Sequence, residues 1–144
     1  MPAVYFEADC AERCPFAFNG DTADLVYFLS FAFSARYGAQ HELTGLSLRL
    51  RSGDHGIDLR PLLTFADRAA EEPADEHELE RAWQEPGPLA ECCRRVVDAF
   101  DGAGPETRAV LRSYPGLRDR IDDLRRMAEW ARDRGARVRV TFAL

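Results

Sequence analysis

Lysine is absent from this 144-residue sequence, and all 19 of its basic residues are arginine. Without lysine the chain cannot form a Schiff base, and it cannot use the lysine of a Walker-type phosphate loop or of a protein kinase. Isoleucine is rare as well, with only Ile57 and Ile121, while alanine is abundant, a composition typical of a GC-rich genome. Arginine is well suited to planar ion pairs and to binding oxyanions.

A long apolar run is also missing. The longest strongly apolar stretch, residues 25–35, is about half of a membrane span. No basic-then-apolar leader opens the chain, so we expect a cytoplasmic protein without a membrane partner. The apolar share of 46% and the charged share of 31% are typical of a folded globular chain.

Short catalytic motifs are missing too. The sequence contains no Gly-x-Ser-x-Gly, His-Glu-x-x-His or Gly-x-Gly-x-x-Gly pattern. Its histidines, His41, His55 and His77, are scattered and form no pair with metal-ligand spacing. No enzyme is indicated and we expect no cofactor, although an enzyme without a visible motif stays open.

The net charge of −6 is unevenly distributed. Residues 66–107 hold twelve acidic and four basic groups, whereas residues 108–144 hold five acidic and ten basic groups. Such a split indicates either a surface for a partner or two parts of one fold that face each other, and we favour the second interpretation.

The first third of the chain predicts a strand, a loop and a helix. Residues 4–8 alternate apolar and polar side chains, as a short strand does. Residues 10–20 have the composition of a loop. A helix follows over residues 22–37, with Asp21 or Thr22 as its N-cap and Gly38 at its end.

A β-hairpin is the clearest local prediction. Leu46, Leu48 and Leu50 alternate with polar residues over 46–51, residues 52–56 have turn composition, and residues 57–60 alternate again. From about 65 to 134 the pattern is helical, with helices near 75–84, 88–101 and 116–134. Alternation returns over residues 138–144, which we predict to be a last strand at a sheet edge.

This order of elements predicts a single α+β domain spanning residues 1–144. It matches the ferredoxin-like split β-α-β sandwich, with extra helices in the second crossover at about 66–134. A mostly helical domain with one β-hairpin is the alternative. In the four-stranded arrangement the polar strand faces would gather five arginines on one surface and so favour an anionic ligand: Arg49, Arg51, Arg60, Arg137 and Arg139.

Four cysteines raise the question of metal or redox chemistry. Cys92 and Cys93 lie on the apolar face of a predicted helix, where free cysteine behaves as a small hydrophobic residue. Cys10 and Cys14 lie in the predicted loop, and the segment from Cys10 to Pro15 resembles the copper-binding loop of the cytochrome-oxidase assembly chaperones over six residues. Two further metal ligands are not apparent, and we expect free thiols.

Aromatic residues cluster between positions 5 and 37, and most of them are explained by core packing. Phe16 and Phe18 differ because they lie in the predicted loop, where they would fill the edge of the core or line an apolar pocket.

Three functions remain open at this point. The first is non-catalytic protein association, as a homodimer. The second is a thiol or metal protein that uses Cys10 and Cys14, and the third is a small-ligand binder with an aromatic pocket near Phe16 and Phe18. A nucleic-acid partner is not favoured, because the expected basic sheet face offers only Tyr5 for base stacking.

Overall fold

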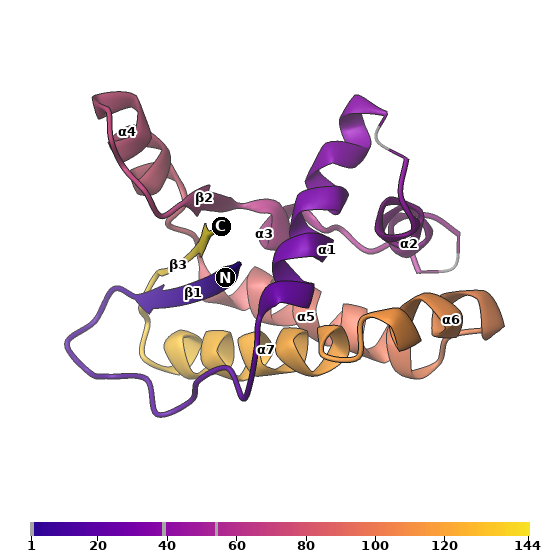
Figure 1. The fold of residues 1–144 in the computed structure, drawn as a ribbon. Coiled ribbons are helices and arrows are strands. Elements are labelled where there is room, and N and C mark those ends of the chain that lie inside the picture. The colour runs from indigo at the N-terminus through magenta and orange to yellow at the C-terminus, as the bar shows by residue number, and fades with distance from the viewer. Residues whose placement is uncertain (1, 39, 54) are drawn as a thin grey trace.

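The computed structural model describes residues 2–38, 40–53 and 55–144 of the chain. Within these residues it is an α+β fold, with a small mixed sheet and several helices (Figure 1). The elements are β1 (Ala3–Ala8), α1 (Ala23–Ser34), η1 (Ala35–Tyr37), α2 (Glu42–Arg51), α3 (Arg60–Leu63), β2 (Phe65–Asp67), α4 (Pro73–Arg81), α5 (Pro86–Asp101), α6 (Pro105–Ser113), α7 (Leu117–Asp133) and β3 (Val138–Ala143).

The elements with a sustained periodicity confirm the sequence predictions. The first and last strands, β1 and β3, lie where the alternating patterns are. The apolar segment after residue 22 forms α1 and the short 3-10 helix η1, which ends at Gly38 with a left-handed φ of 79°. Helices α5 and α7 agree with the predicted ranges to within two residues.

The predicted β-hairpin is wrong, because residues 42–51 form the helix α2. Leu43, Leu46 and Leu50 recur at helical spacing and are buried, whereas Leu48 is 50% exposed. The same stretch therefore carries two periodicities, and burial against α1 favours the helical one. The ring of His41 stacks on Phe31 of α1 at 3.9 Å and its Nδ1 accepts the backbone N–H of Leu43, so the start of α2 is fixed against α1.

The second arm of that hairpin is not a strand either. Residues 57–59 are irregular and lead into α3, and Asp54 of the predicted turn lies outside the described residues. Instead, a strand that the sequence did not predict, β2, follows at Phe65–Asp67. Three residues are too few to show an alternating pattern, which explains why β2 was missed.

The sheet has the order β1-β3-β2, so the four-stranded ferredoxin-like arrangement is not what the structure shows. The last strand, β3, is central: it pairs antiparallel with β1 and parallel with β2. The expectation that β3 lies at an edge is therefore wrong. On the β2 side, Val138 and Gln84 also exchange two backbone hydrogen bonds of 2.8 and 2.9 Å, so β3 is paired along both of its sides.

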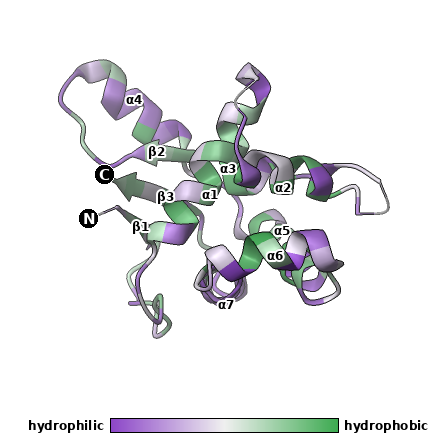
Figure 2. Ribbon diagram, turned by 45° about the vertical axis from the view of Figure 1, so that its right-hand side comes forward, coloured by the Kyte–Doolittle hydropathy of each residue, from purple (hydrophilic) through white to green (hydrophobic). Residues whose placement is uncertain are grey.

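The helices cover one face of this sheet. Val4, Val138 and Val140 point to that face and are buried in one continuous core with α1, α5 and α7. Phe28 of α1 meets Phe100 of α5 edge to face, with ring centroids 6.4 Å apart. Figure 2 shows apolar colour along α1 and α3, whereas α4 is hydrophilic and projects from the sheet with no buried residue.

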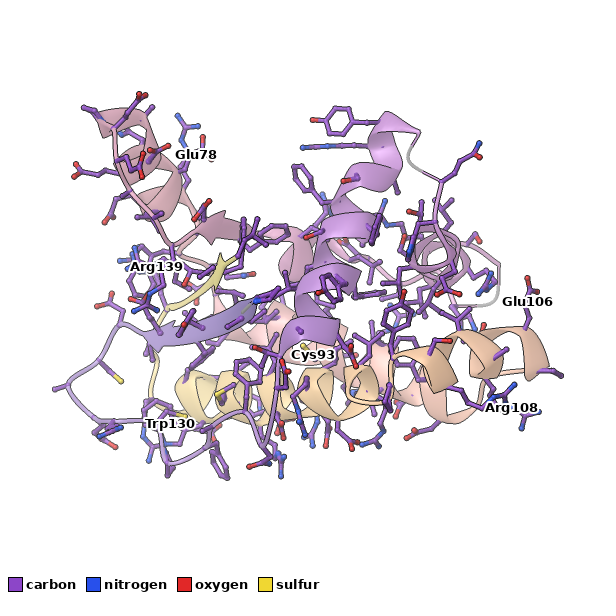
Figure 3. All side chains as sticks on the ribbon, viewed as in Figure 1. Glu78, Cys93, Glu106, Arg108, Trp130 and Arg139 are labelled. Atoms are coloured by element: carbon purple, nitrogen blue, oxygen red, sulfur yellow. The ribbon has the colours of Figure 1, made fainter. Side chains whose placement is uncertain are left out.

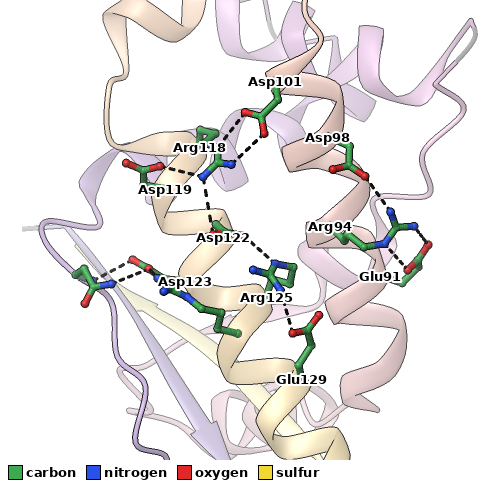
Figure 4. Close-up of polar contacts among 12 residues, drawn as sticks. Glu91, Arg94, Asp98, Asp101, Arg118, Asp119, Asp122, Asp123, Arg125 and Glu129 are labelled. Carbon is green, nitrogen blue, oxygen red and sulfur yellow. Dashed lines mark hydrogen bonds and ion pairs between the residues drawn. The ribbon is translucent and has the colours of Figure 1, made fainter.

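One ion pair among the described residues joins the acidic segment 66–107 to the basic segment 108–144. Arg118 of α7 binds the carboxylate of Asp101 on α5 at 3.0 Å, and Arg125 binds Glu129 one turn along α7 at 2.9 Å (Figure 4). The pairing lowers the pKa of Asp101 below its usual value, chiefly because Arg118 donates a hydrogen bond to it. Within the described parts of the chain, charge pairing between the two segments is confined to this contact, because Arg134, Arg137 and Arg139 bind acidic residues near the N-terminus instead.

The helical register of α2 has a direct test in two leucines. Replacing the buried Leu46 by alanine is expected to lower the free energy of unfolding by about 2–5 kcal/mol, because it leaves a cavity in the core. Replacing the half-exposed Leu48 in the same way is expected to cost about 0.5 kcal/mol or less. Urea unfolding of both variants measures the difference. Equal losses would indicate the inward alternation of a strand and would contradict the helix.

Candidate functional site

A groove runs beside β1, between this strand and the loop that follows it. The loop leaves β1, passes below it on the side of α7 and rises to α1 (Figure 1). The groove has a volume of about 490 Å³, and Met127 of α7 lies at its base. One wall is β1 itself, residues 4–8, and the other is formed by Glu12, Arg13, Cys14, Phe16, Ala17 and Phe18.

The strand wall of the groove presents backbone groups. In an antiparallel pair, alternate residues direct their N–H and C=O groups toward the neighbouring strand. Asp9 donates its backbone N–H to Arg137 at 2.8 Å, whereas Val4 donates its own to Oγ1 of Thr22 at 2.9 Å, on the opposite side. The backbone N–H groups of Phe6 and Ala8 point to the same side as that of Val4. Among the described residues they find no acceptor.

The loop wall of the groove presents aromatic side chains. Phe16 is 45% exposed and Phe18 is partly buried against the core. The structure thus places both predicted pocket residues along the groove, opposite the edge of β1. An unpaired strand edge beside apolar side chains can bind an extended polypeptide, whose backbone completes the ladder and whose side chains contact the apolar wall.

A buried carboxylate holds the end of this loop. Asp123 of α7, with a side chain only 1% exposed, accepts the backbone N–H and the side-chain amide of Asn19, each at 3.0 Å (Figure 4). Nε of Arg120 lies 2.9 Å from the same carboxylate, and Arg126 binds its other oxygen. Gly20 packs directly against this cluster: an added Cβ would lie 2.4 Å from Nη1 of Arg120, and its φ of 153° disfavours other residues.

Two further ion pairs hold the beginning of the loop. Glu12 binds Nε of Arg134 at 2.8 Å, and the guanidinium of Arg134 stacks 4.4 Å above the ring of Trp130, which Figure 3 labels at the lower edge of the molecule. Asp9 binds Arg137 at 3.1 Å. The outer wall of the groove is therefore fixed at three points along its length, which reduces the conformational entropy that a bound partner would have to remove.

The loop cysteines do not form a metal site with the other described residues. Cys10 is exposed and its thiol donates to the carbonyl of Glu12 at 3.4 Å, while Cys14 lines the groove. Across residues 2–38, 40–53 and 55–144 no three His, Cys, Asp or Glu side chains are grouped as ligands. Partial burial raises the pKa of the Cys14 thiol, which makes it a weaker nucleophile at neutral pH.

The five arginines predicted to share one basic sheet face are spread over three places, so that prediction is wrong. The prediction fails because residues 42–51 form the helix α2, which carries Arg49 and Arg51 away from the sheet. Arg49 contacts α6, where its Nε donates to Oγ1 of Thr107 at 3.2 Å. Arg51 and Arg60 line a separate cavity near the end of α1, together with Arg36, which no sequence pattern marked as a site residue.

The remaining two arginines lie at β3, on or beside the sheet face away from the core. Arg139 binds Glu7 of β1 at 2.8 Å and stacks 4.5 Å from the ring of Trp83, and Arg137 lies 5.7 Å from the same ring. Figure 3 labels Arg139 beside the strands. Since Arg139 and Arg137 pair with Glu7 and Asp9, they connect β1 to β3 and leave little charge for an anionic ligand.

The carboxylate of Asp123 is expected to be the most sensitive position of the loop attachment. Asp123→Ala leaves Arg120 and Arg126 without their buried counter-charge and is expected to lower the free energy of unfolding by about 3–5 kcal/mol. The matched control is Asp133→Ala at the exposed end of the same helix. This substitution is expected to change the free energy of unfolding by about 0.5 kcal/mol or less. Chemical denaturation measures both; similar values would contradict the role given to Asp123.

The four thiols are expected to differ in reactivity. Cys10 is exposed and reacts first with a disulfide reagent, and Cys14 reacts more slowly. Burial raises the pKa of Cys92 to about 12 and that of Cys93 well above its usual value, so both are expected to react only after unfolding. A thiol titration of the native and the unfolded protein counts them. Rapid reaction of all four thiols in the native protein would contradict the buried placement.

Comparison with known proteins assigns no family. No family model matches the chain, and neither a curated protein nor a solved structure is significantly similar to it. In the part of the chain that the structure describes, no helix has the length and apolar character needed to cross a membrane.

Proposed function

We propose that the protein is a non-catalytic association domain that forms a homodimer by pairing β1 with β1 of a second copy. The observation that supports this proposal is the edge of β1, where the N–H groups of Phe6 and Ala8 face a groove and have no acceptor among the described residues. Unpaired backbone groups at a strand edge favour pairing with another strand.

The composition of β1 favours this pairing, because its residues lack the side chains that usually protect an edge strand. Its six residues, AVYFEA, contain no proline and no lysine. Its one charge, on Glu7, points to the other sheet face and is already bound to Arg139. The opposite side of the sheet differs: β2 has only three residues. β1 is thus the longer of the two outer strands, and since Thr22 binds the N–H of Val4, its free edge runs from Phe6 to Ala8.

An antiparallel arrangement about a two-fold axis satisfies both copies at once. With Phe6 of one copy opposite Ala8 of the partner subunit, the N–H groups of both residues gain a carbonyl acceptor, and Val4, whose N–H is already bound to Thr22, stays outside the new ladder. The two three-stranded sheets then become one sheet of six strands. The half-buried side chains of Phe6 and Ala8 are covered in the process, and Phe16 at the groove wall contacts the partner.

Sedimentation equilibrium over a range of protein concentrations tests this proposal. The wild type is expected to approach twice the chain mass of 16.2 kDa at high micromolar concentration. Ala8→Pro removes an N–H that faces the groove while the bonds of Tyr5 and Glu7 to β3 remain, so it is expected to be monomeric. A wild type that stays monomeric throughout would contradict the proposal.

Two matched surface variants separate the groove from general surface effects. Phe16→Glu places a charge at the groove wall and is expected to weaken dimerisation at least tenfold. Leu48→Glu changes a side chain of similar exposure on α2, since Leu48 is 50% exposed and Phe16 is 45% exposed. This substitution is expected to leave dimerisation unchanged. Equal effects of the two substitutions would contradict an interface at β1.

A small apolar ligand is the second candidate occupant of the groove. The volume of about 490 Å³ beside Phe16, Phe18 and Met127 favours it. A fluorescent apolar dye distinguishes a ligand pocket from an association interface. Dye binding that persists in the monomeric Ala8→Pro variant and is lost in Phe18→Ser supports a ligand pocket. Dye binding that is excluded as the protein dimerises supports the association interface.

A further inference from the structure

A second cavity, separate from the groove beside β1, lies between the end of α1, the end of α2 and α3. Its volume is about 490 Å³. Its apolar lining consists of Phe33, Leu63 and the buried side chains of Ile57 and Leu59. Its polar lining is dominated by arginine, which makes the cavity amphipathic: an apolar inner surface lies beside a cationic one.

Two of these arginines are held in place without an ion pair. The guanidinium carbon of Arg36 lies 4.0 Å above the ring of Phe33 and 5.1 Å from that of Tyr37. Nη2 of Arg51 donates to the carbonyl of Ala32, in the last turn of α1, at 3.4 Å. Neither guanidinium lies within 4.0 Å of a described carboxylate. Both therefore keep N–H groups for a ligand.

The third arginine is already neutralised. Arg60 binds the carboxylate of Asp58 with contacts of 2.7 and 3.0 Å. These hydrogen bonds lower the pKa of Asp58 to about 2, so its carboxylate stays ionised across the physiological range. Three arginines and one aspartate thus leave two net positive charges in the cavity, those of Arg36 and Arg51.

We propose that this cavity binds the phosphate monoester of a small molecule with an apolar group. A phosphate monoester carries about −1.5 to −2 charges at neutral pH, which matches the two arginines that have no ion pair among the described residues. Guanidinium groups bind phosphate oxygens through paired N–H donors. The apolar group then packs on Phe33 and Leu63, the partly exposed members of the apolar lining. The proposal is independent of association through β1, because no residue lines both the cavity and the groove.

Titration calorimetry with phenyl phosphate tests the cationic half of the site. The wild type is expected to bind with saturation, and Arg36→Gln and Arg51→Gln are each expected to weaken binding at least tenfold. The control is Arg108→Gln, a change of an exposed arginine on α6 that does not line the cavity, and it is expected to leave binding unchanged. Unfolding temperatures of all variants verify that they are folded.

Two further probes test the apolar half and the choice of phosphate. Inorganic phosphate lacks the apolar group, and phenylacetate carries one charge instead of two, so both are expected to bind at least tenfold more weakly than phenyl phosphate. The proposal is overturned if the wild type does not bind phenyl phosphate, if the three arginine variants weaken binding equally, or if either probe binds as tightly as phenyl phosphate.

Discussion

The buried carboxylate of Asp123 is the interaction on which the candidate site depends. It binds two N–H groups of Asn19 and the guanidinium groups of Arg120 and Arg126, and so it attaches a loop without regular structure to the longest helix. An unpaired charge at this depth would be costly, so its four contacts have to form together. Because the loop is the outer wall of the groove, this carboxylate, the one buried attachment among its three, shapes the groove.

The position of β3 determines where that edge is. Since β3 pairs with β1 on one side and with β2 and Gln84 on the other, its own backbone groups are satisfied within the fold. The unpaired groups lie on β1, beside the loop that Asp123 holds. The ion pairs of Glu7 with Arg139 and of Asp9 with Arg137 join β1 to β3 on the other sheet face. Sheet topology and loop attachment thus place an edge and an apolar wall side by side.

Periodicity predicted the parts of this fold that are long and have a single pattern. Strands β1 and β3, helices α1, α5 and α7, and the burial of Cys92 and Cys93 all follow from it. It failed at residues 46–50, where the leucines fit a strand and a helix and tertiary packing decides between them. The hydrogen bonds between Asn19 and Asp123 span 104 positions, and nothing local marks either residue. Phe16 and Phe18 were predicted to line a pocket or the edge of the core because they are aromatic residues in a loop. The unpaired edge of β1, in contrast, follows only from the topology of the sheet.

Amide hydrogen exchange of β1 at several protein concentrations tests the central claim most directly. The N–H groups of Tyr5 and Glu7 bind β3 within one chain, so their protection is expected to be independent of concentration. Those of Phe6 and Ala8 are expected to exchange rapidly in dilute solution and to become protected as the concentration rises. If Phe6 and Ala8 exchange equally fast at all concentrations, the edge of β1 does not pair and the account is contradicted.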